Sequence, residues 1–331
     1  MPQQVQIVFV VGFARSGTTL LATLLDRHSQ MAATPETHFF DEVLPRGARP
    51  DTARDAAVLV SSFLGSARVR DLGLTSEDFA NLVERRTCSW RDLFSHALAV
   101  YAGRHRAPIV VEKTPAHMTK VSQILEWYPD AKVIHILRDG RDAVLSLLRA
   151  PWTHSNLRRH ARTWRWCVKR MARSQRAHPA RIFEVRYEAL LAHPDDTLRS
   201  VCDFIGVKFE PAQLRPADAQ RTVPEWESEW KAKAAAELDP ARIQAWKRTA
   251  TPKQRWIMNS MMGGALRERG YGETSLADCP LPTRVANAFL NAIFLAAYHP
   301  AMKPAFAGVK RALKFFGLPT DQIDRPGRAD D

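Results

Sequence analysis

Five short hydrophobic runs, separated by polar turns, set the pattern of this chain. The first, Ile7–Val11, is continuous and rich in β-branched residues, as is typical of a strand buried on both faces of a parallel sheet. The other runs predicted as strands are Ser29–Thr34, Ala107–Glu112, Ala131–Leu137 and Arg181–Arg186. After the first run, apolar residues recur at helical spacing, at Leu20, Leu21, Leu24 and Leu25. The pattern predicts an α/β fold, a parallel β-sheet flanked by helices.

Longer helical patterns lie between and after these strands. Residues 41–105 contain stretches such as Asp55–Leu64 and Trp90–Tyr101, which predict a helical insertion. His160–Met171 predicts a helix that packs its tryptophans on the sheet and covers them with arginine stems. A further helix is expected to begin at His193-Pro194-Asp195 and to run through Phe204.

The end of the chain is predicted to form a separate helical extension. We place the α/β domain over residues 1–275 and the extension over residues 276–331. Val285–Tyr298 is strongly apolar, but its length of about 14 residues is less than the roughly 20 needed to cross a bilayer. Ala301–Phe316 mixes basic and apolar residues, and such a helix can lie on an anionic membrane surface. Packing on the α/β domain or on a second subunit is the favoured alternative.

Composition narrows the choice of partner. The chain has 331 residues, 45% hydrophobic and 25% charged, enough for one large α/β domain with a helical appendage. Its formal net charge of +13 favours an anionic partner. We assign this charge to a multiply charged cofactor and to solvated surface. We do not expect nucleic-acid binding, because we find no nucleic-acid-binding motif and no basic tail with interleaved aromatics.

The cysteines and the first residues bear on location. Four cysteines lie far apart and predict buried, reduced thiols in a reducing compartment: Cys88, Cys167, Cys202 and Cys279. Met1–Gln6 has no basic region, and the apolar run that follows is too short for a signal peptide. We therefore expect a cytoplasmic protein. Three contacts are left open for its extension: the membrane surface through residues 285–316, a second subunit in a homodimer, and the α/β domain.

The segment after the first strand has the spacing of a phosphate-binding loop. Residues 12–19 read GFARSGTT, which is G-x-x-x-x-G with a hydroxyl residue two places after the second glycine. Such a turn at a helix N-terminus binds anions through backbone N–H groups and the helix dipole. Thr18 stands where nucleotide triphosphatases have a lysine, and Arg15 supplies a basic side chain within the loop. The anion cradle is kept, and an ATPase or kinase is disfavoured.

This loop resembles that of a known family. The run GFARSGTTLL is similar to the 5′-phosphosulfate loop of sulfotransferases that use 3′-phosphoadenosine 5′-phosphosulfate (PAPS). It is most similar to tyrosylprotein sulfotransferases and related bacterial enzymes. The resemblance implies a sulfotransferase fold, with PAPS as sulfuryl donor and no metal required. It also implies a set of cofactor-binding residues in the loop, of which Arg15 is catalytic as well: Arg15, Ser16, Gly17, Thr18 and Thr19.

Two further positions match catalytic residues of the family. Glu36, followed by Thr37, matches the glutamate that acts as general base in tyrosylprotein sulfotransferases. Taken alone, Glu36 would be interpreted as a solvated carboxylate or a helix cap. The run EKTP resembles the family's lysine-containing turn, whose lysine contacts the sulfuryl group or the bridging oxygen, and Lys113 is its match. A lysine at a strand exit can also simply be a solvated strand end.

The resemblance extends to the 3′-phosphate of the cofactor. Arg138, at the end of a strand, and Ser146, on the helix after it, match the family's 3′-phosphate motif. For Arg141 and the two neighbouring aspartates, a surface ion-pair cluster is the simpler explanation. Lys247 and Arg248 lie in an element that resembles a K-W-x-x motif near the same phosphate, although Ala245 replaces the lysine of that motif.

Two more segments resemble cofactor-contacting parts of the family. Tyr187, in a turn that reads YEAL, matches a tyrosine on the adenine side of the cofactor. Arg215–Asp239 is rich in proline, glutamate, lysine and tryptophan and has little periodicity. We expect this segment to be a mobile cover over the bound cofactor.

These residues converge on one predicted site. Ligands of parallel sheets bind beyond the carboxyl ends of the strands, and Arg15, Lys113, Arg138 and Tyr187 each follow a predicted strand end. The prediction is in-line transfer of a sulfuryl group from PAPS to a hydroxyl or amine, with Glu36 as general base. The class of acceptor, whether small molecule, carbohydrate, lipid or peptide, is left open.

Two other functions stay open. The first is a P-loop-type kinase of a small metabolite. The second is a nucleotide- or lipid-binding protein without catalysis, an alternative that the basic C-terminal helix supports. No metal is expected, because none of the 11 histidines has the spacing of metal ligands, and His96 and His105 are assigned to packing or to the surface.

Overall fold

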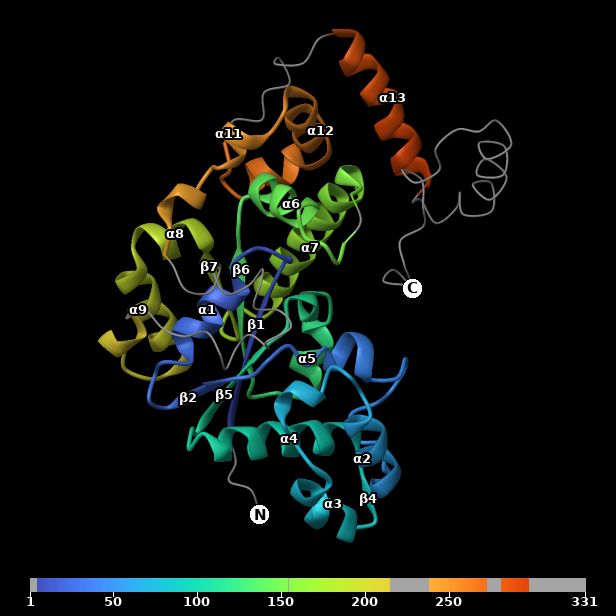
Figure 1. Cartoon of the computed structure of the whole chain (residues 1–331), viewed down its shortest axis with the longest axis vertical. Helices are drawn as coiled ribbons and strands as arrows, with labels where there is room; N and C mark the ends of the chain where they lie inside the picture. The colour runs from blue at the N-terminus through green and yellow to red at the C-terminus, as the bar shows by residue number, and fades with distance from the viewer. Residues whose placement is uncertain (1–4, 154, 215–237, 273–280, 298–331) are drawn as a thin grey trace. The chain divides into compact units, whose positions relative to one another are not determined.

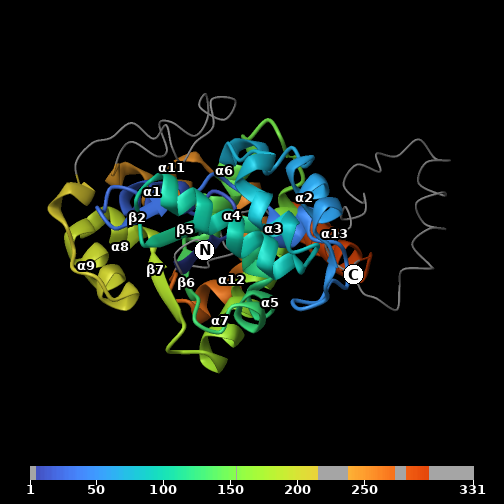
Figure 2. The ribbon, with the colours of Figure 1, turned by 90° about the horizontal axis from the view of Figure 1, so that it is seen from below.

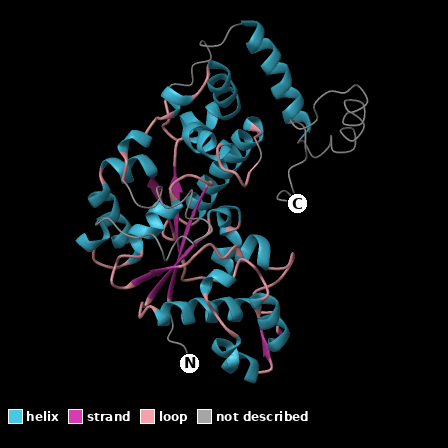
Figure 3. Cartoon of the chain, in the orientation of Figure 1, coloured by secondary structure: helices cyan, strands magenta, loops and turns pink. Residues whose placement is uncertain are grey.

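A five-stranded parallel sheet is the central element of the fold (Figure 1). The computed structural model describes residues 5–153, 155–214, 238–272 and 281–297. The sheet has the order β2-β5-β1-β6-β7, and every neighbouring pair is parallel. Its strands, magenta in Figure 3, are β1 (Gln6–Gly12), β2 (Met31–Ala33), β5 (Ile109–Lys113), β6 (Lys132–Leu137) and β7 (Ile182–Arg186). All five predicted strands are present, and the predicted α/β class is confirmed.

The chain forms two compact units. The first comprises Met1–Arg138 and Arg170–Ile243, and the second comprises Asp139–Lys169 and Gln244–Asp331. Helix α7 (Leu157–Ala177) contributes residues to both units. The units divide the chain at other points than residue 275, so the predicted functional division into 1–275 and 276–331 stays a prediction.

Burial on both faces explains the continuous apolar run of β1. Successive side chains of a strand point to opposite faces. Val8 and Val10 join the core formed with α1 (Thr18–Leu25), α8 (Tyr187–Ala192) and α9 (Pro194–Ile205). On the other face, the ring of Phe9 lies 6.2 Å from that of Phe40 and 6.0 Å from that of Tyr128. The strand thus has no solvent face, as its sequence predicts.

The segment between β2 and β5 is the predicted helical insertion. Its helices are η1 (Phe39–Val43), α2 (Ala56–Leu64), η2 (Arg70–Leu72), η3 (Ser76–Phe79), α3 (Ala80–Glu84) and α4 (Trp90–Arg104). A short antiparallel pair joins β3 (Arg54–Asp55) to β4 (Thr87–Cys88). Helices α2, α3 and α4 group together at the lower end of Figure 1 and face the viewer in Figure 2. The stretch from Phe39 to Val43 is a π-helical turn.

The remaining helices complete the two units. In the first unit these are η4 (Pro115–Thr119), α5 (Val121–Trp127), η5 (Pro211–Leu214) and η7 (Pro240–Arg242). In the second they are α6 (Gly140–Leu148), α11 (Trp246–Thr249), α12 (Pro252–Glu268) and α13 (Leu281–Ala297). The predicted YEAL turn is the start of helix α8. Among the described residues, no helix has the length and apolar character to cross a membrane.

Helix α13 is held in the second unit by a buried asparagine. Arg158 Nε donates to Asn291 Oδ1 at 2.7 Å, and Asn291 Nδ2 donates to Ser260 Oγ on α12 at 2.8 Å. Other side chains of α13, Val285 and Phe289 among them, are exposed. The predicted amphipathic helix 301–316 lies outside the described residues, as do residues 215–237 of the predicted cover 215–239.

The ion-pair cluster predicted at the surface is buried instead. Arg141 Nη2 lies 2.7 Å from Asp139 Oδ2, and both side chains are only 3% exposed. The Arg141 guanidinium lies 3.9 Å from the ring of Trp246, whose backbone N–H donates to Asp142 Oδ1. The surface prediction is wrong because the segment at Trp246 covers the pair.

The cysteines agree with the prediction of buried thiols where they are described. Cys88, Cys167 and Cys202 are buried and are not in disulfides. Burial raises the pKa of the Cys88 thiol to about 11, which keeps the thiol protonated. Cys279 lies outside the described residues.

Candidate active site

The carboxyl ends of the strands bring most of the predicted site residues to one edge of the sheet. Strand β1 ends at Gly12, which is the first residue of the predicted phosphate loop. Strand β5 ends at Lys113, and Arg138 and Tyr187 directly follow β6 and β7. Because parallel strands share the edge at which they end, the first unit gathers these groups at the position where α/β proteins bind ligands.

The loop between β1 and α1 has the backbone of an anion-binding turn. Arg15 and Gly17 have positive φ values of 68° and 99°. Gly17 is the N-cap of α1 and provides no side-chain cap for the first N–H groups of the helix. A Cβ atom on Gly17 would lie 2.4 Å from Cδ2 of Tyr187, so only glycine fits there. The loop can therefore hold an anion on backbone N–H groups and the positive end of the helix dipole.

Replacing Gly17 by alanine is expected to lower the melting temperature and the affinity of the loop for anions. The cost combines the left-handed backbone, about 1–2 kcal/mol, with overpacking against Tyr187, about 1–3 kcal/mol. Gly47→Ala is the matched control, since Gly47 has φ 73° but nothing within 4 Å of the added Cβ. Thermal unfolding of both variants separates the two costs. Equal losses in the two variants would contradict the close contact between Gly17 and Tyr187.

Hydroxyl groups of the loop fit an anionic ligand. Ser16 is 1% exposed, and its Oγ has no hydrogen-bond partner among the described residues. A buried hydroxyl without a partner is costly, so an unpaired donor in such a loop indicates a ligand oxygen as partner. Thr18 is buried and Thr19 half-buried in the first turn of α1.

Arginines concentrate positive charge beside the loop. Arg138 Nη1 donates to the backbone oxygen of Arg15 at 2.9 Å, and its Nη2 donates to that of Arg242 at 3.2 Å. Its guanidinium also lies 4.3 Å from the centroid of the Tyr187 ring. Burial, and then the charges of Arg138 and Arg242, lower the pKa of Arg15. Like charges held together in this way favour the binding of an anion between them.

Arg242 is a site residue that sequence reasoning missed. Arg242 is the first residue of the run RIQAWKR. Within this run, the predicted 3′-phosphate contact was assigned to Lys247 and Arg248, because they follow the tryptophan. Lys247 and Arg248 are exposed residues of the second unit, to which the half-buried Ser146 also belongs. Their assignment to a 3′-phosphate stays a prediction. Tyr187 joins the site as the buried ring between Gly17 and Arg138, and its contact with adenine also stays a prediction.

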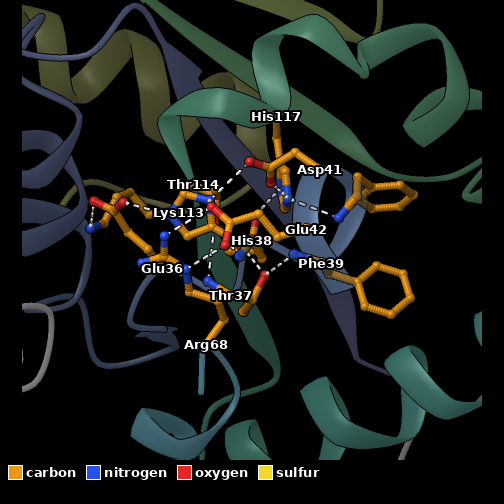
Figure 4. Close-up of polar contacts among 12 residues, drawn as sticks. Glu36, Thr37, His38, Phe39, Asp41, Glu42, Arg68, Lys113, Thr114 and His117 are labelled. Carbon is orange, nitrogen blue, oxygen red and sulfur yellow. Dashed lines mark hydrogen bonds and ion pairs between the residues drawn. The ribbon is translucent and has the colours of Figure 1, made fainter. Parts of the chain in front are cut away.

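Glu36 and Lys113 form an ion pair at the same edge of the sheet (Figure 4). Lys113 Nζ donates to Glu36 Oε1 at 2.9 Å. Lys113 is fully buried, whereas the Glu36 side chain is 15% exposed. Lys113 is also the last residue of β5, paired in register with Val10, and not the first residue of the turn as predicted. Pairing with β1 extends the strand by one residue and buries the lysine. A buried ammonium group needs a charged or hydrogen-bonding partner.

A buried carboxylate, Glu112, binds the residues next to this pair. Glu112 is fully buried and accepts hydrogen bonds from Thr37 Oγ1 at 2.7 Å and from Thr114 Oγ1 at 2.6 Å. Thr114 Oγ1 in turn accepts from the backbone N–H of Thr37. Sequence reasoning missed Glu112, since a glutamate at the end of a strand is normally solvated. Its contacts fix the segment that carries Glu36 to the end of β5.

His117 completes the network around Glu112. Its Nδ1 lies 2.9 Å from Glu112 Oε2, and its Nε2 lies 3.3 Å from Asp41 Oδ1. Burial alone would lower the pKa of His117, but Glu112 and Asp41 raise it to about 9. The ring therefore carries a positive charge at neutral pH and faces a carboxylate with each nitrogen.

His38 lies on the other side of Glu36. Its Nε2 is 3.3 Å from Glu36 Oε2, and its Nδ1 is 2.9 Å from Asp41 Oδ2. Burial alone would lower the pKa of His38, but the hydrogen bonds to Asp41 and Glu36 raise it to about 9. Sequence reasoning did not single out His38 or Asp41, because no metal-type or triad-type spacing marks them.

Three side chains at this position are of the types that bind metal ions. His38, Asp41 and Glu42 offer ligand atoms within 4.8 Å of one another. Arg68, however, forms two hydrogen bonds with Glu42, at 2.7 Å and 2.8 Å, and His38 Nδ1 faces Asp41. We therefore assign these groups to an ion-pair network.

The fold and the site together define an α/β protein with an anion-binding loop at the edge of its sheet and a lysine–glutamate pair beside it. The chain belongs to the sulfotransferase family, whose model matches residues 7–211.

The chain is also similar to individual proteins. It is 25% identical over 218 residues to a protein-tyrosine sulfotransferase of Drosophila melanogaster, covering 64% of this chain and 40% of that protein. It is 24% identical to protein-tyrosine sulfotransferase A of Caenorhabditis elegans, covering 62% and 51% of the two chains. The chain thus spans about half the length of the curated relatives it matches.

A solved structure agrees on the fold. The sulfotransferase domain of the Synechococcus PCC 7002 olefin synthase matches with a TM-score of 0.55 at 20% identity. The match covers 80% of this chain and 96% of that domain. The predicted sulfotransferase fold is confirmed.

Proposed function

We propose that this protein transfers a sulfuryl group from PAPS to a hydroxyl or amine acceptor. The observation that carries the proposal is the Lys113–Glu36 pair, which lies at the sheet edge where the anion-binding loop begins. Such a transfer needs a cation that stabilises the changing charge and a base that accepts a proton. Lys113 can supply the first and Glu36 the second. Membership of the sulfotransferase family supports the same assignment.

The donor end of the site suits the two phosphates of PAPS. PAPS carries the sulfuryl group on its 5′-phosphate and a second phosphate at the 3′ position. Arg15, Ser16, Thr18 and Thr19, with the N-terminus of α1, would stabilise the charge that grows on the 5′-phosphate. Arg138 is the proposed contact of the 3′-phosphate in the first unit. The orphaned hydroxyl of Ser16 and the cluster of arginines fit these anions.

Glu36 and Lys113 carry the proposed chemistry. Glu36 takes the proton of the acceptor O–H or N–H group. The acceptor atom forms a bond to sulfur, and the bond from sulfur to the 5′-phosphate oxygen breaks, which releases 3′,5′-phosphoadenosine. Lys113 Nζ stabilises the sulfuryl group and the leaving oxygen as their charge changes. The transfer resembles phosphoryl transfer in that most of the catalysis comes from positioning and charge.

The acceptor class that we propose for this protein is broader than the one in the names of the relatives. Their names assign protein tyrosine to those proteins. Acceptor specificity is carried by other parts of a fold than the donor site, so we assign only a hydroxyl or amine here. We propose the helical insertion from 41 to 105 as the wall of the acceptor site.

Ligand-dependent stability tests the donor assignment. We expect 3′,5′-phosphoadenosine at about 100 times its Kd to stabilise the protein by about 2.7 kcal/mol, and ATP with Mg²⁺ to have no such effect. Thermal unfolding with each ligand measures the difference. Stabilisation by ATP with Mg²⁺ alone would favour the kinase alternative. Stabilisation by 3′,5′-phosphoadenosine without turnover of PAPS, for any acceptor class, would favour a binding protein.

Replacing Arg138 by alanine is expected to weaken the binding of 3′,5′-phosphoadenosine by about tenfold or more, because a hydrogen bond to a charged group contributes about 1.5–3 kcal/mol. Titration calorimetry measures the change. Arg85→Ala, at an exposed arginine of the same unit, is the control and should bind normally. Wild-type affinity in Arg138→Ala would mean that this guanidinium only ties the backbones of Arg15 and Arg242 together.

A further inference from the structure

A histidine between two carboxylates lies next to the proposed general base (Figure 4). His38 faces Glu36 through Nε2 and Asp41 through Nδ1, at 3.3 Å and 2.9 Å. All three side chains are mostly buried, with 14%, 15% and 20% exposed fractions for His38, Glu36 and Asp41. Glu36 thus has a cationic partner for each carboxylate oxygen, since Lys113 holds Oε1 and His38 faces Oε2.

The backbone holds His38 in an uncommon conformation. Its φ is 48°, in the left-handed region that residues other than glycine rarely occupy. Both neighbours anchor it: Thr37 is fully buried and bound to Glu112, and the ring of Phe39 stacks on that of Phe94 at 3.8 Å. Backbone strain of this kind persists only where the surroundings fix it, and such positions concentrate at functional sites.

Charged groups from several elements face this histidine and its partners. Beyond Glu36 and Asp41, Glu42 Oε1 lies 3.5 Å from His38 Nδ1, and Arg68 neutralises Glu42. His117 Nε2 lies 3.3 Å from the second oxygen of Asp41, and Glu112 lies behind His117. Lys113 and Arg15 act on Glu36 from the sheet edge. Glu36, Asp41 and Glu42 each lie within 3.5 Å of a ring nitrogen, and the cations named here act on these carboxylates, so the imidazolium form of His38 is favoured.

We propose that His38 is a positioning residue for Glu36: its imidazolium holds the second carboxylate oxygen, and Asp41 holds the imidazolium. This rests on the proposed function, in which Glu36 is the general base. When Lys113 turns to the sulfuryl group, His38 keeps Glu36 oriented towards the acceptor and ionised, ready to take the proton.

The charge of His38 predicts an alkaline limit to activity. Asp41 and Glu36 raise the pKa of His38 to about 9 in spite of burial, so the ring is cationic below that pH and neutral above it. A neutral ring has one proton, and one of its nitrogens then turns a lone pair towards a carboxylate. Above about pH 9, His38 can no longer hold both Glu36 and Asp41, and kcat should fall.

Three variants test the proposal through the pH profile of kcat. In His38→Gln we expect kcat to fall roughly tenfold to a hundredfold, as for a misplaced catalytic group, and the limb near pH 9 to disappear. Its acidic limb should move to higher pH, since Glu36 loses a positive neighbour and its pKa rises. In Asp41→Asn the alkaline limb should move to lower pH, because His38 loses a carboxylate that raises its pKa. His178→Gln, at an exposed histidine, should keep the wild-type profile.

A measurement without turnover separates this inference from the proposed function. Titration of the histidine ring by NMR should give a pKa for His38 well above its usual range in the wild-type protein, and a lower one in Glu36→Gln. A His38 pKa that Glu36→Gln leaves unchanged would overturn the pairing. Uniformly lower kcat in His38→Gln with an unchanged pH profile would overturn the positioning role. If the pairing is found and no acceptor is sulfated, the proposed function and the positioning role both fail, although the ion pair itself stands.

Discussion

Glu36→Gln is expected to lower kcat by about 10²–10⁴-fold, the usual contribution of general acid–base catalysis, while the binding of 3′,5′-phosphoadenosine is kept. The amide has nearly the shape of the carboxylate but cannot accept the proton of the acceptor. It also removes the negative charge between Lys113 and His38, both of which lie within 3.3 Å of Glu36. Steady-state kinetics with saturating PAPS, together with calorimetry of the product nucleotide, measures the two effects.

The control for this variant is Glu77→Gln, at an exposed glutamate of the same unit, which should keep full turnover. If Glu36→Gln also turned over at the wild-type rate, Glu36 could not be the base, and the carboxylate would only balance the charge of Lys113. If nucleotide binding was lost as well, the effect would be one of folding or of the donor site. Thermal unfolding of the variant distinguishes these two causes.

Lys113→Met is expected to reduce kcat by about 100-fold, by analogy with the loss of one transition-state donor. Methionine fills the volume of the lysine stem but removes the ammonium group that faces Glu36. Lys113 is fully buried, so solvent cannot supply a hydrogen-bond donor at the position of the lost ammonium group. The affinity for 3′,5′-phosphoadenosine should change less than kcat, because the lysine acts mainly when charge moves from the sulfuryl group to the leaving oxygen.

Two further variants define what the lysine does. Lys253→Met removes an exposed lysine and should leave kcat unchanged. Lys113→Arg keeps the charge but replaces a compact ammonium by a planar guanidinium in a fully buried position, and it should restore little activity. Full activity in Lys113→Met would contradict a role of this lysine in the transfer and leave it as a structural partner of Glu36.

The strands and the loop could be predicted because their signals are local. A strand that is buried on both faces has a continuous apolar run, as Ile7–Val11 does. The glycines of the loop are required by the conformation of the loop's own backbone, which a short stretch of sequence determines. Gly17, for example, has a positive φ and nearly touches Tyr187. The predictions of Glu36 and Lys113 came instead from a family resemblance, since a lone glutamate or lysine near a strand end carries little signal.

The groups around the site depend on contacts that no local pattern marks. Glu112 meets Thr37, 75 positions away in the chain, and Arg138 meets Arg242, 104 positions away. His38 is recognisable only when Glu36 and Asp41 are placed on either side of it. The ion pair of Arg141 was predicted at the surface for the same reason: the segment at Trp246 that buries it is distant in sequence.

The proposed sulfuryl transfer is best tested with radiolabelled sulfur in PAPS. Transfer of the label is measured for the wild-type protein and for Glu36→Gln with a panel of hydroxyl and amine acceptors. In the wild-type protein, label should enter at least one acceptor, with one 3′,5′-phosphoadenosine released for each sulfuryl group transferred. Glu36→Gln should bind the nucleotide but transfer label about 10²–10⁴-fold more slowly. Equal transfer by the two proteins, or no transfer to any acceptor by a wild-type protein that phosphorylates one from ATP, would contradict it.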